Sequence, residues 1–370
     1  MPSRRKKFVF LVQGEGRGHM TQAIRLYQIL TNNGHQVLHI FIGKSDRRIV
    51  PDYFSSAFDI PVELIDSPNF ISDSKNKSIR LIPSIIHNTK YLKRYWKSLN
   101  RINTVIKLIK PDALINFYDF LGGLYSFLYK PKIKYIVVGH QFLTRHPAFE
   151  FSPGKFLHKK LFIINNYLNS LGADIIFALS FMPYDPLKIG KTIVTPPLLR
   201  DHLHTLKTEN KNFILGYMVN DGYSQEIVDW NRNNPQVRLH IFWDRKGEPE
   251  VVNVSETLTF HQLNADKFLR MMAQCKGLVT TAGFESICEA MYLGKPVLMV
   301  PVKGQYEQLC NAIDAVKAGA GIQCDRFNIS RLLEFIPRYE SRVNEFKIWY
   351  EKGYHLFNEA LTNLAASPRL

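Results

Sequence analysis

The feature that most constrains this chain is a repeated alternation of short apolar runs with segments of helical periodicity. In the first half the runs are KFVFLVQ, HQVLHIFIG, PVELID, DALINFYD, IKYIVVGH and ADIIFALS, at intervals long enough for crossover helices. The rhythm restarts later with NFILGYMV, VRLHIFWD, ETLTFHQL, GLVTTA and KPVLMVPV. Alternation of this kind is typical of a parallel, doubly wound sheet. The sequence therefore predicts an α/β fold with two similar domains in tandem.

A Pro-rich stretch, TPPLLRDHL, interrupts the rhythm and marks the expected boundary between the domains. A chain of 370 residues is longer than one hydrophobic core usually organises, which also favours two domains. We expect a first domain over residues 1–195, a linker over 196–212 and a second domain over 213–340, with a cleft between the domains. The last helical pattern has no strand after it, and residues 341–370 are expected to form a terminal helix.

The formal net charge of +16 lies entirely in the first half of the chain, because residues 196–370 hold as many acidic as basic side chains. Such asymmetry indicates that one half meets an anionic partner, which is a phospholipid surface, a phosphorylated acceptor or a nucleic acid. Nucleic acid is the weakest of the three, because no recognised nucleic-acid-binding module accompanies the charge.

Residues 75–110 concentrate this charge, with ten Lys and Arg and no acidic residue. Apolar residues recur there at helical spacing, which is typical of a core-facing helix with a solvated basic face. The other interpretation is a basic amphipathic element that docks on an anionic membrane or a charged acceptor. A second basic patch, at residues 155–172, favours the docking interpretation.

Cysteine usage and hydropathy indicate a cytoplasmic protein. No pair of the four cysteines has CxxC spacing, which is typical of reduced thiols and not of a disulfide framework or a zinc site. No apolar run approaches the ~20 residues that span a bilayer. The basic start is followed by too short an apolar run for a secretory signal.

The loop GEGRGHM follows the first apolar run and opens a helix. Its GxGxG spacing, with His19 in place of a third glycine, departs from the dinucleotide fingerprint, and no acid ends the second strand. No Gly-Lys-Ser/Thr follows, so the loop is not a P-loop. Gly14, Gly16 and Gly18 predict a tight strand-to-helix turn. His19 at the helix start is either a general base or a residue that only caps the helix or bonds locally.

A second segment, TTAGFESICEAMYLGKPVLMVPVKGQYEQLCNA, combines a strand, a glycine turn and a helix. The turn at Gly283 presents a helix N-terminus that can meet a diphosphate, and Ser286 can add a hydroxyl contact. Glu289 can accept hydrogen bonds from a ribose diol, although a solvated helix face is the alternative for this residue alone. Glu307 and Gln308, after the next strand, can bind sugar hydroxyls.

This segment resembles the donor-binding motif of GT-B glycosyltransferases, such as the MurG-type GlcNAc transferases and the small-molecule UDP-glycosyltransferases. The matching positions are Gly283, Ser286, Glu289, the run PVLMVP, Glu307, Gln308 and Asn311. The resemblance implies two Rossmann-like domains around a central cleft, with a C-terminal helix that crosses back to the first domain. It also implies that Glu289 binds the ribose, that Ser286 and the Gly283 turn bind the diphosphate, and that Glu307 and Gln308 bind the donor sugar.

The resemblance extends to the first domain, where the family's glycine-rich loop ends in Gly-His, as Gly18 and His19 do here. It implies that His19 deprotonates or orients the acceptor hydroxyl. Asp119 is the candidate acid that pairs with this histidine and fixes its tautomer. His140 and Gln141 resemble in position a His-Glu-Gln-Asn run of the MurG type, although a core histidine is an equal alternative for His140.

Several positions depart from the family pattern. A threonine pair stands where plant-type enzymes place a histidine, and the glycine turn of the second domain is reduced to Gly216 and Gly222. The nucleotide base is expected near Leu263. No Asp-x-Asp occurs in the chain, which argues against the metal-dependent class of glycosyltransferase. We expect no metal and no cofactor beyond a nucleotide-sugar co-substrate, with helix dipoles and polar side chains offsetting the leaving diphosphate.

The sequence thus predicts an inverting, metal-independent glycosyltransferase that uses a nucleotide-diphosphate sugar, with UDP-GlcNAc as the example, and an acceptor hydroxyl. The basic half predicts an anionic or lipid-linked acceptor and a peripheral position at the inner face of the membrane. Two alternatives remain, a nucleotide-sugar 2-epimerase on the same fold and a non-catalytic subunit that binds nucleotide sugars.

Overall fold

The computed structural model describes residues 5–44, 50–69, 81–185, 190–218, 221–245 and 247–364. Within them, one sheet contains β1 (Lys7–Val12), β2 (Gln36–Lys44), β3 (Val62–Asp66), β4 (Ala113–Phe117), β5 (Lys134–Gly139), β6 (Ile175–Leu179) and β7 (Thr192–Thr195). A second contains β8 (Ile214–Tyr217), β9 (Leu239–Trp243), β10 (Val251–Asn253), β11 (Leu258–Gln262), β12 (Gly277–Thr280), β13 (Val297–Met299) and β14 (Gly321–Gln323).

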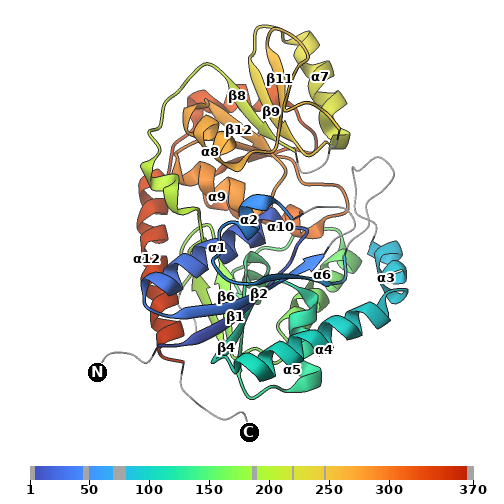
Figure 1. Ribbon diagram of the computed structural model, residues 1–370. Helices are drawn as coiled ribbons and strands as arrows, with labels where there is room; N and C mark the ends of the chain where they lie inside the picture. The colour runs from blue at the N-terminus through green and yellow to red at the C-terminus, as the bar shows by residue number, and fades with distance from the viewer. Residues whose placement is uncertain are drawn as a thin grey trace.

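The two sheets lie one above the other, each in its own half of the chain (Figure 1). Their strand orders are β3-β2-β1-β4-β5-β6-β7 and β10-β11-β9-β8-β12-β13-β14. In the second sheet β10 runs antiparallel to β11, and the other paired strands of both sheets run parallel. The expected α/β fold with two domains of parallel sheet is confirmed.

Helices cover both faces of the first sheet, because its strands are apolar on both sides. One face, which includes Phe10 and Val12, packs against α1 (Arg17–Asn32) and α2 (Asp52–Ser55). The other face, which includes Val9 and Leu11, packs against α4 (Leu92–Ile109), α5 (Phe120–Tyr129) and α6 (Phe156–Asn169).

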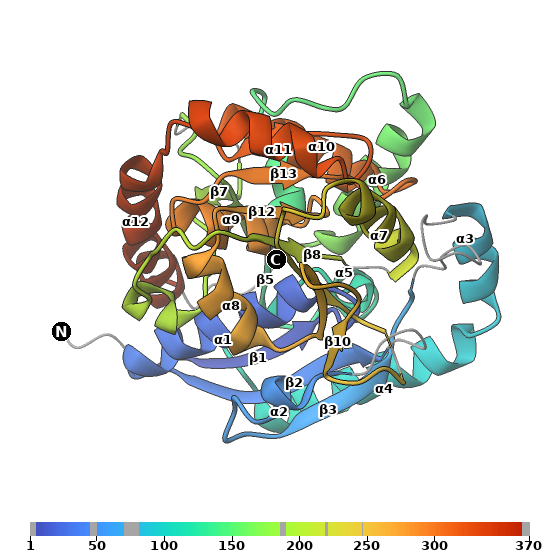
Figure 2. The same cartoon turned by 90° about the horizontal axis from the view of Figure 1, so that it is seen from above.

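The second sheet is covered in the same way. One face packs against α7 (Ser224–Asn233) and α11 (Ile329–Phe335). The other face packs against α8 (Ala265–Gln274), α9 (Phe284–Tyr292) and α10 (Tyr306–Lys317). Seen from above, this domain lies over the first one (Figure 2).

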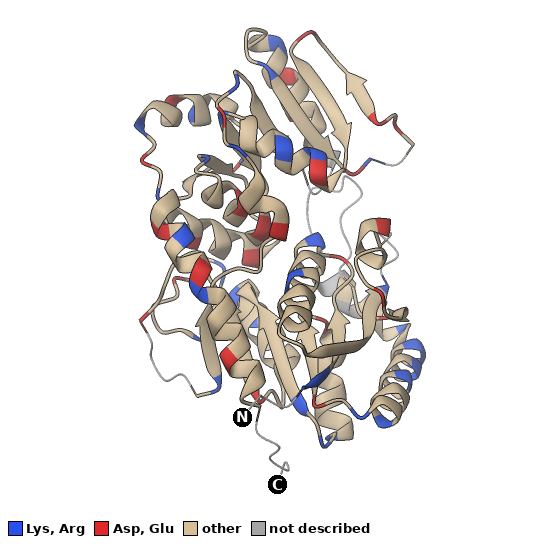
Figure 3. Ribbon diagram, turned by 60° about the vertical axis from the view of Figure 1, so that its left-hand side comes forward, with Lys and Arg blue, Asp and Glu red and all other residues tan. Residues whose placement is uncertain are grey.

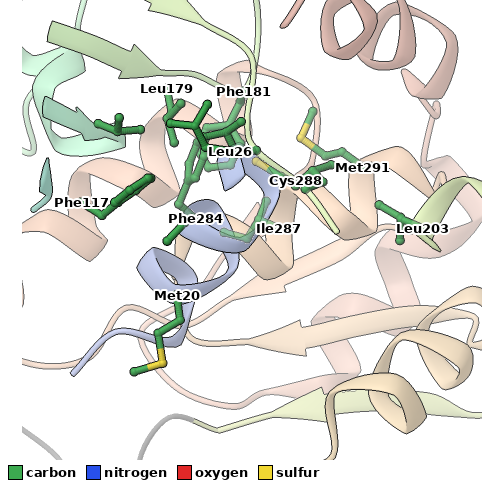
Figure 4. Close-up of a cluster of buried hydrophobic side chains, with 14 of the residues drawn as sticks. Met20, Leu26, Phe117, Leu179, Phe181, Leu203, Phe284, Ile287, Cys288 and Met291 are labelled. Carbon is green, nitrogen blue, oxygen red and sulfur yellow. The ribbon is translucent and has the colours of Figure 1, made fainter. Parts of the chain in front are cut away.

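A single hydrophobic cluster joins the two domains. Phe284 and Ile287 of α9 belong to the same cluster as Met20 of α1, Phe117 of β4 and Phe181 (Figure 4). The rings of Phe181 and Phe284 lie 4.6 Å apart. The apolar core is therefore continuous across the domain boundary.

The terminal helix α12 (Val343–Thr362) returns to the first domain, as the resemblance implied, and runs along one side of the molecule (Figure 1). Trp349 Nε1 donates to the carbonyl of Ser180 at 3.2 Å, and the rings of Phe177 and Phe357 lie 4.8 Å apart. Lys6 Nζ then donates to the carbonyl of Leu364 at 2.7 Å.

Other expectations about elements are largely confirmed. The helix that follows the GEGRGHM loop forms as α1, and it begins at Arg17, inside the loop. The backbone of Gly16 is extended and caps α1, so the last three residues of the loop before Met20 already belong to the helix. The strands β7, β10 and β14 were not predicted. All four cysteines carry free thiols.

The basic segment expected over residues 75–110 forms α3 (Leu81–Thr89) and α4, and its first residues, 75–80, lie outside the described ranges. Tyr95, Leu99 and Ile102 are buried on the core side of α4. On the outer side, Arg101 forms a two-point ion pair with Glu63 of β3, with N–O distances of 2.8 and 2.9 Å. The expected core-facing helix is confirmed for α4, and its basic residues lie on the outer side.

Candidate active site

A cavity of about 250 Å³ lies between the two domains. It is bounded by the β1–α1 loop and the start of α1 on one side, and by the starts of α9 and α10 on the other. Most of the residues selected from the sequence line it: Gly16, Gly18, His19, His140, Gln141, Leu263, Gly283, Ser286, Glu289, Glu307 and Gln308. Five do not line it: Gly14, Asp119, Gly216, Gly222 and Asn311.

The three glycines of the opening loop permit three close approaches. A side chain at Gly14 would overlap the carbonyl oxygen of Gly43, at the end of β2. A Cβ at Gly16 would lie 2.9 Å from the ring of His19. A Cβ at Gly18 would lie 2.9 Å from Cγ of Glu285, which comes from the second domain. Only the last two glycines shape the cavity itself.

His19 is buried in the first turn of α1 and faces the cavity. Its Nδ1 lies 3.4 Å from Oε1 of Gln22, its Nε2 lies 3.5 Å from Nε2 of Gln141, and its ring stacks on Tyr118 with centroids 5.6 Å apart. Burial lowers the pKa of His19 to about 4. The imidazole is therefore neutral near pH 7, with a lone pair available to accept a proton.

The expected pairing of Asp119 with His19 is not formed. Asp119 caps the N-terminus of α5, where its Oδ1 accepts from the backbone N–H of Leu121 at 2.9 Å and from the hydroxyl of Ser67 at 2.8 Å. The preceding residue, Tyr118, has a φ of 61°, in the left-handed region that bulky residues rarely adopt. This turn brings the ring of Tyr118, and not the carboxylate of Asp119, against His19. Burial raises the pKa of Asp119 to about 6.

His140 and Gln141 both line the cavity, but they make different contacts. The Nδ1 of His140 lies 2.7 Å from the carbonyl of Leu179, and its ring stacks on Phe284 at 4.2 Å, so His140 is a core histidine at the edge of the cavity. Burial lowers its pKa to about 4. Gln141 Nε2 donates to Oε1 of Glu307 at 2.9 Å, across the domain boundary.

The start of α9 is open toward the cavity. Gly283 caps this helix, and a Cβ there would meet no atom within 4 Å. The first N–H groups of a helix attract anions, so the turn can hold a phosphate group. Ser286 lines the cavity next to it, with its hydroxyl 3.5 Å from that of Thr280. Glu289 is buried and lies 3.4 Å from Nε of Arg200, which limits the rise in pKa that burial causes.

The start of α10 supplies the other polar residues. Burial raises the pKa of Glu307 to about 7, against the hydrogen bond from Gln141. The Oε1 of Gln308 accepts from the backbone N–H of Val302 at 2.9 Å, so its amide nitrogen remains for a ligand. Asn311 donates to the carbonyl of Ala282 at 3.1 Å and thereby fixes the turn before α9.

Leu263, selected near the expected nucleotide base, and Gly216, selected from the glycine turn of the second domain, differ in position. Leu263 lines the cavity, whereas Gly216 lies inside β8, where a side chain would overlap Ile241 of β9. This glycine provides room for a neighbouring strand and does not approach the cavity. Its neighbour Tyr217 lines the cavity instead.

Gln22, Tyr53, Arg200 and Glu285 are among the lining residues that the sequence did not predict. Gln22 lies three positions after His19, hence on the same helix face, and this spacing was an available signal. Glu285 follows Gly283 by two positions. Tyr53 and Arg200 come from α2 and from the segment after β7, and no local pattern marks them.

The part of the chain that the structure describes has no group of three or more His, Cys, Asp or Glu side chains placed to hold a metal ion. The polar groups of the cavity instead suit a ligand with anionic and hydroxyl groups, because a helix N-terminus, an arginine and several hydrogen-bonding side chains converge there.

Comparison with known proteins defines the class. A solved structure of a glycotransferase of kitacinnamycin matches with a TM-score of 0.65 at 13% identity, covering 96% of this chain and 99% of that one. A UDP-glucosyltransferase from Polygonum tinctorium matches with a TM-score of 0.64 at 11% identity, covering 98% and 99%. A third structure, LpCGTa in complex with UDP, has a TM-score of 0.62 at 15% identity, covering 97% and 99%. The molecule has the GT-B fold of glycosyltransferases.

The family follows from the sequence comparisons. The family model described as Glycosyl transferase family 1 matches residues 6–339, and the chain belongs to this family. A relative from Fusobacterium nucleatum is 23% identical over 380 residues, covering 93% of each chain. It is the UDP-N-acetylglucosamine--N-acetylmuramyl-(pentapeptide) pyrophosphoryl-undecaprenol N-acetylglucosamine transferase of that organism.

Proposed function

We propose that this glycosyltransferase moves a sugar from a UDP-sugar, with UDP-GlcNAc as the first candidate, to an acceptor hydroxyl, with inversion and without a metal ion. The observation that carries the proposal is the opposition of neutral, buried His19 and the open helix N-terminus at Gly283 across one cavity. The name of the Fusobacterium nucleatum relative includes UDP-N-acetylglucosamine, and one structure of the same fold contains UDP.

The reaction is a single displacement. Nε2 of His19 takes the proton of the acceptor hydroxyl, whose oxygen attacks the anomeric carbon of the donor. The bond between that carbon and the diphosphate oxygen breaks, and the electron pair leaves with the diphosphate. The N–H groups at Gly283 and the hydroxyl of Ser286 stabilise this developing charge. Because the acceptor oxygen attacks the anomeric carbon from the side opposite the leaving diphosphate, the single displacement inverts the configuration at that carbon.

With the diphosphate at the Gly283 turn, the other lining residues make the remaining contacts with the donor. Glu289, held beside Arg200, accepts hydrogen bonds from the ribose hydroxyls. Glu307 and Gln308 bind the hydroxyls of the sugar. Leu263 packs against the nucleotide base.

The test compares the wild type with His19→Ala and Glu289→Ala. Thermal shift with UDP-, GDP- and dTDP-sugars identifies the donor, because a ligand that binds only the native state raises the midpoint. UDP release is then measured with the lipid-linked acceptor that the relative's name specifies. We expect His19→Ala to lower kcat by about 10²-fold or more while the shift with donor persists. We expect Glu289→Ala to abolish the donor shift.

Two results would contradict the proposal. Full turnover in His19→Ala would show that His19 is not the general base. Conversion of UDP-GlcNAc alone to its 2-epimer would instead make the protein an epimerase.

We further propose that the first domain docks on an anionic membrane and that the acceptor is lipid-linked. Lys and Arg recur along the helices of this domain (Figure 3). Large apolar side chains are exposed among them on α4, α5 and α6, with Phe156 and Leu108 each 80% exposed. Basic residues beside apolar ones suit an interface of acidic headgroups and acyl chains. Among the described helices, none has the length and apolar character that a membrane span requires. The protein would act as a peripheral enzyme at the cytoplasmic face.

A further inference from the structure

A chain of polar contacts crosses from the first domain to the second beside the cavity. His19 Nδ1 lies 3.4 Å from Oε1 of Gln22, and Nε2 of Gln22 donates to Oε1 of Glu285 at 2.6 Å. All three side chains are buried and line the cavity. Glu285 belongs to the first turn of α9, the helix whose N-terminus faces the proposed diphosphate.

The amide of Gln22 has a defined orientation in this chain. Its nitrogen donates to the oxygen of Glu285, so its oxygen faces the imidazole. An amide oxygen only accepts hydrogen bonds, which requires that Nδ1 of His19 carries the proton. The lone pair then lies on Nε2, the atom that faces Gln141 and the side of the cavity where Glu307 approaches.

The backbone around this contact is shaped for it. A Cβ at Gly18 would lie 2.9 Å from Cγ of Glu285, so the glycine lets α9 approach α1. The ring of Phe284, the residue before Glu285, stacks on His140 and fixes the first turn of α9 against the first domain. The titratable and charged groups around Glu285 are Glu289, Cys288 and Arg200, together with His19 behind Gln22.

We propose that Gln22 and Glu285 are positioning residues that hold His19 in its Nδ1-protonated tautomer when the donor helix lies against α1. They fix the tautomer of His19, which is the role that the sequence analysis assigned to Asp119. An amide does not pass a proton along this path, so the chain transmits orientation only. Because Glu285 comes from the donor domain, the base is oriented only while the two domains are in contact. The inference rests on the proposed function, since it assigns His19 as the base.

The first test reads the tautomer without any reaction. ¹⁵N spectra of histidine-labelled protein distinguish protonated from unprotonated ring nitrogens, and the signals of His19 are assigned from their loss in His19→Gln. We expect protonated Nδ1 and unprotonated Nε2 in the wild type and a mixture of tautomers in Gln22→Ala. Gln28→Ala, at a half-buried position of the same helix that does not line the cavity, is the matched control and is expected to leave the spectrum unchanged. A wild type protonated at Nε2 would overturn the proposal, whatever its activity.

The second test compares the loss of the hydrogen bond between Gln22 and Glu285 with a change of the carboxyl group that keeps this bond. UDP release is measured with the donor selected by thermal shift and the lipid-linked acceptor described above. We expect kcat to fall by about tenfold to a hundredfold in Gln22→Ala and in Glu285→Ala, with KM for the donor changed by less than about threefold. Glu285→Gln keeps an oxygen that accepts from Gln22 and is expected to retain kcat within about threefold.

The outcomes are distinguishable from a failure of the proposed function. Equal losses in Glu285→Gln and Glu285→Ala would overturn the positioning role. So would a rise in KM with unchanged kcat, because that pattern indicates lost donor binding. If His19→Ala retains full turnover, the base assignment fails, while the tautomer measurement still reports whether Gln22 orients the ring.

Discussion

At the scale of single residues, the cavity stands out for carboxyl groups that keep their protons. Burial raises the pKa of Glu285 to about 8, offset in part by the hydrogen bond from Gln22, and raises that of Glu307 to about 7. Burial lowers the pKa of His19 to about 4. Near neutral pH His19 is therefore neutral and Glu285 keeps its proton, while Arg17 and Arg200 also line the cavity. A lining with fewer carboxylates and two guanidinium groups favours the entry of a diphosphate.

Glu285 gives a prediction about stability and pH. In the unfolded chain the carboxyl loses its proton near pH 4.5, whereas in the folded protein it keeps the proton to about pH 8. Its contribution to stability is thus fully present below pH 4.5 and is lost as pH rises toward 8, by about 1.4 kcal/mol per pH unit. We expect Glu285→Gln to be more stable than the wild type at pH 8, with a smaller difference at pH 5. Urea unfolding at the two pH values measures this.

Glu63 supplies a control of opposite sign. Its hydrogen bonds from Arg101 lower its pKa, so its contribution to stability is present near neutral pH and is lost as pH falls. Glu63→Gln is therefore expected to destabilise the protein at neutral pH, with the difference shrinking in acid. Identical differences at pH 5 and pH 8 for Glu285→Gln would mean that its carboxyl titrates normally.

At the scale of elements, α12 is the clearest case of a helix held by tertiary contacts. Trp349 is 7% exposed and donates to the carbonyl of Ser180. We expect Trp349→Ala to cost about 3–5 kcal/mol and Trp349→Phe only about 1–2 kcal/mol, because phenylalanine loses the hydrogen bond but fills most of the space. The unfolding midpoint in urea measures both.

Ile348, the preceding residue on the same helix, is 60% exposed and provides the control. Ile348→Ala is expected to change stability by less than about 0.5 kcal/mol. Equal effects at the two positions would show that α12 does not pack through Trp349.

The elements also differ in whether the sequence alone predicts them. β1 and β4 were predictable because a strand buried on both faces is a continuous apolar run. The strands β7, β10 and β14 are only partly buried and do not form a continuous apolar run. His19 and the Gly283 turn were predictable because each belongs to a short ordered motif. The contact of Gln22 with Glu285 joins residues 263 positions apart, so only the folded chain reveals it.

Asp119 illustrates a limit of a different kind. An acid at the start of a helix is favoured as a cap because it satisfies backbone N–H groups that have no partner within the helix. That local role takes up one carboxylate oxygen here, and the conformation of Tyr118 turns the residue away from His19. The sequence placed Asp119 after a strand of the first domain, but the direction of its side chain depends on a backbone conformation that no sequence pattern determines.

At the scale of the whole molecule, the distribution of charge predicts binding to anionic vesicles. We expect co-sedimentation with vesicles containing acidic phospholipids, weaker in 0.5 M salt, and none with neutral vesicles. Phe156→Ser combined with Leu157→Ser is expected to weaken binding roughly tenfold or more, because both side chains are exposed and available for insertion.

Val251→Ser combined with Val254→Ser, at exposed positions of the second domain, is the matched control. We expect this variant to bind as the wild type does. If binding does not depend on salt or on lipid charge, or if no binding occurs in any condition, an anionic membrane surface is not the partner of the basic half.

The continuous core has a consequence for protein engineering. Since Phe284 and Ile287 of the second domain pack in the same cluster as Met20 of the first, the domains are not interchangeable modules. A chimera that joins this second domain to the first domain of another family member must also carry matching residues on α1. It must bring a compatible α12 as well, because Trp349 of that helix bonds to the first domain. Recombination points chosen only at the linker would cut through one cooperative folding unit.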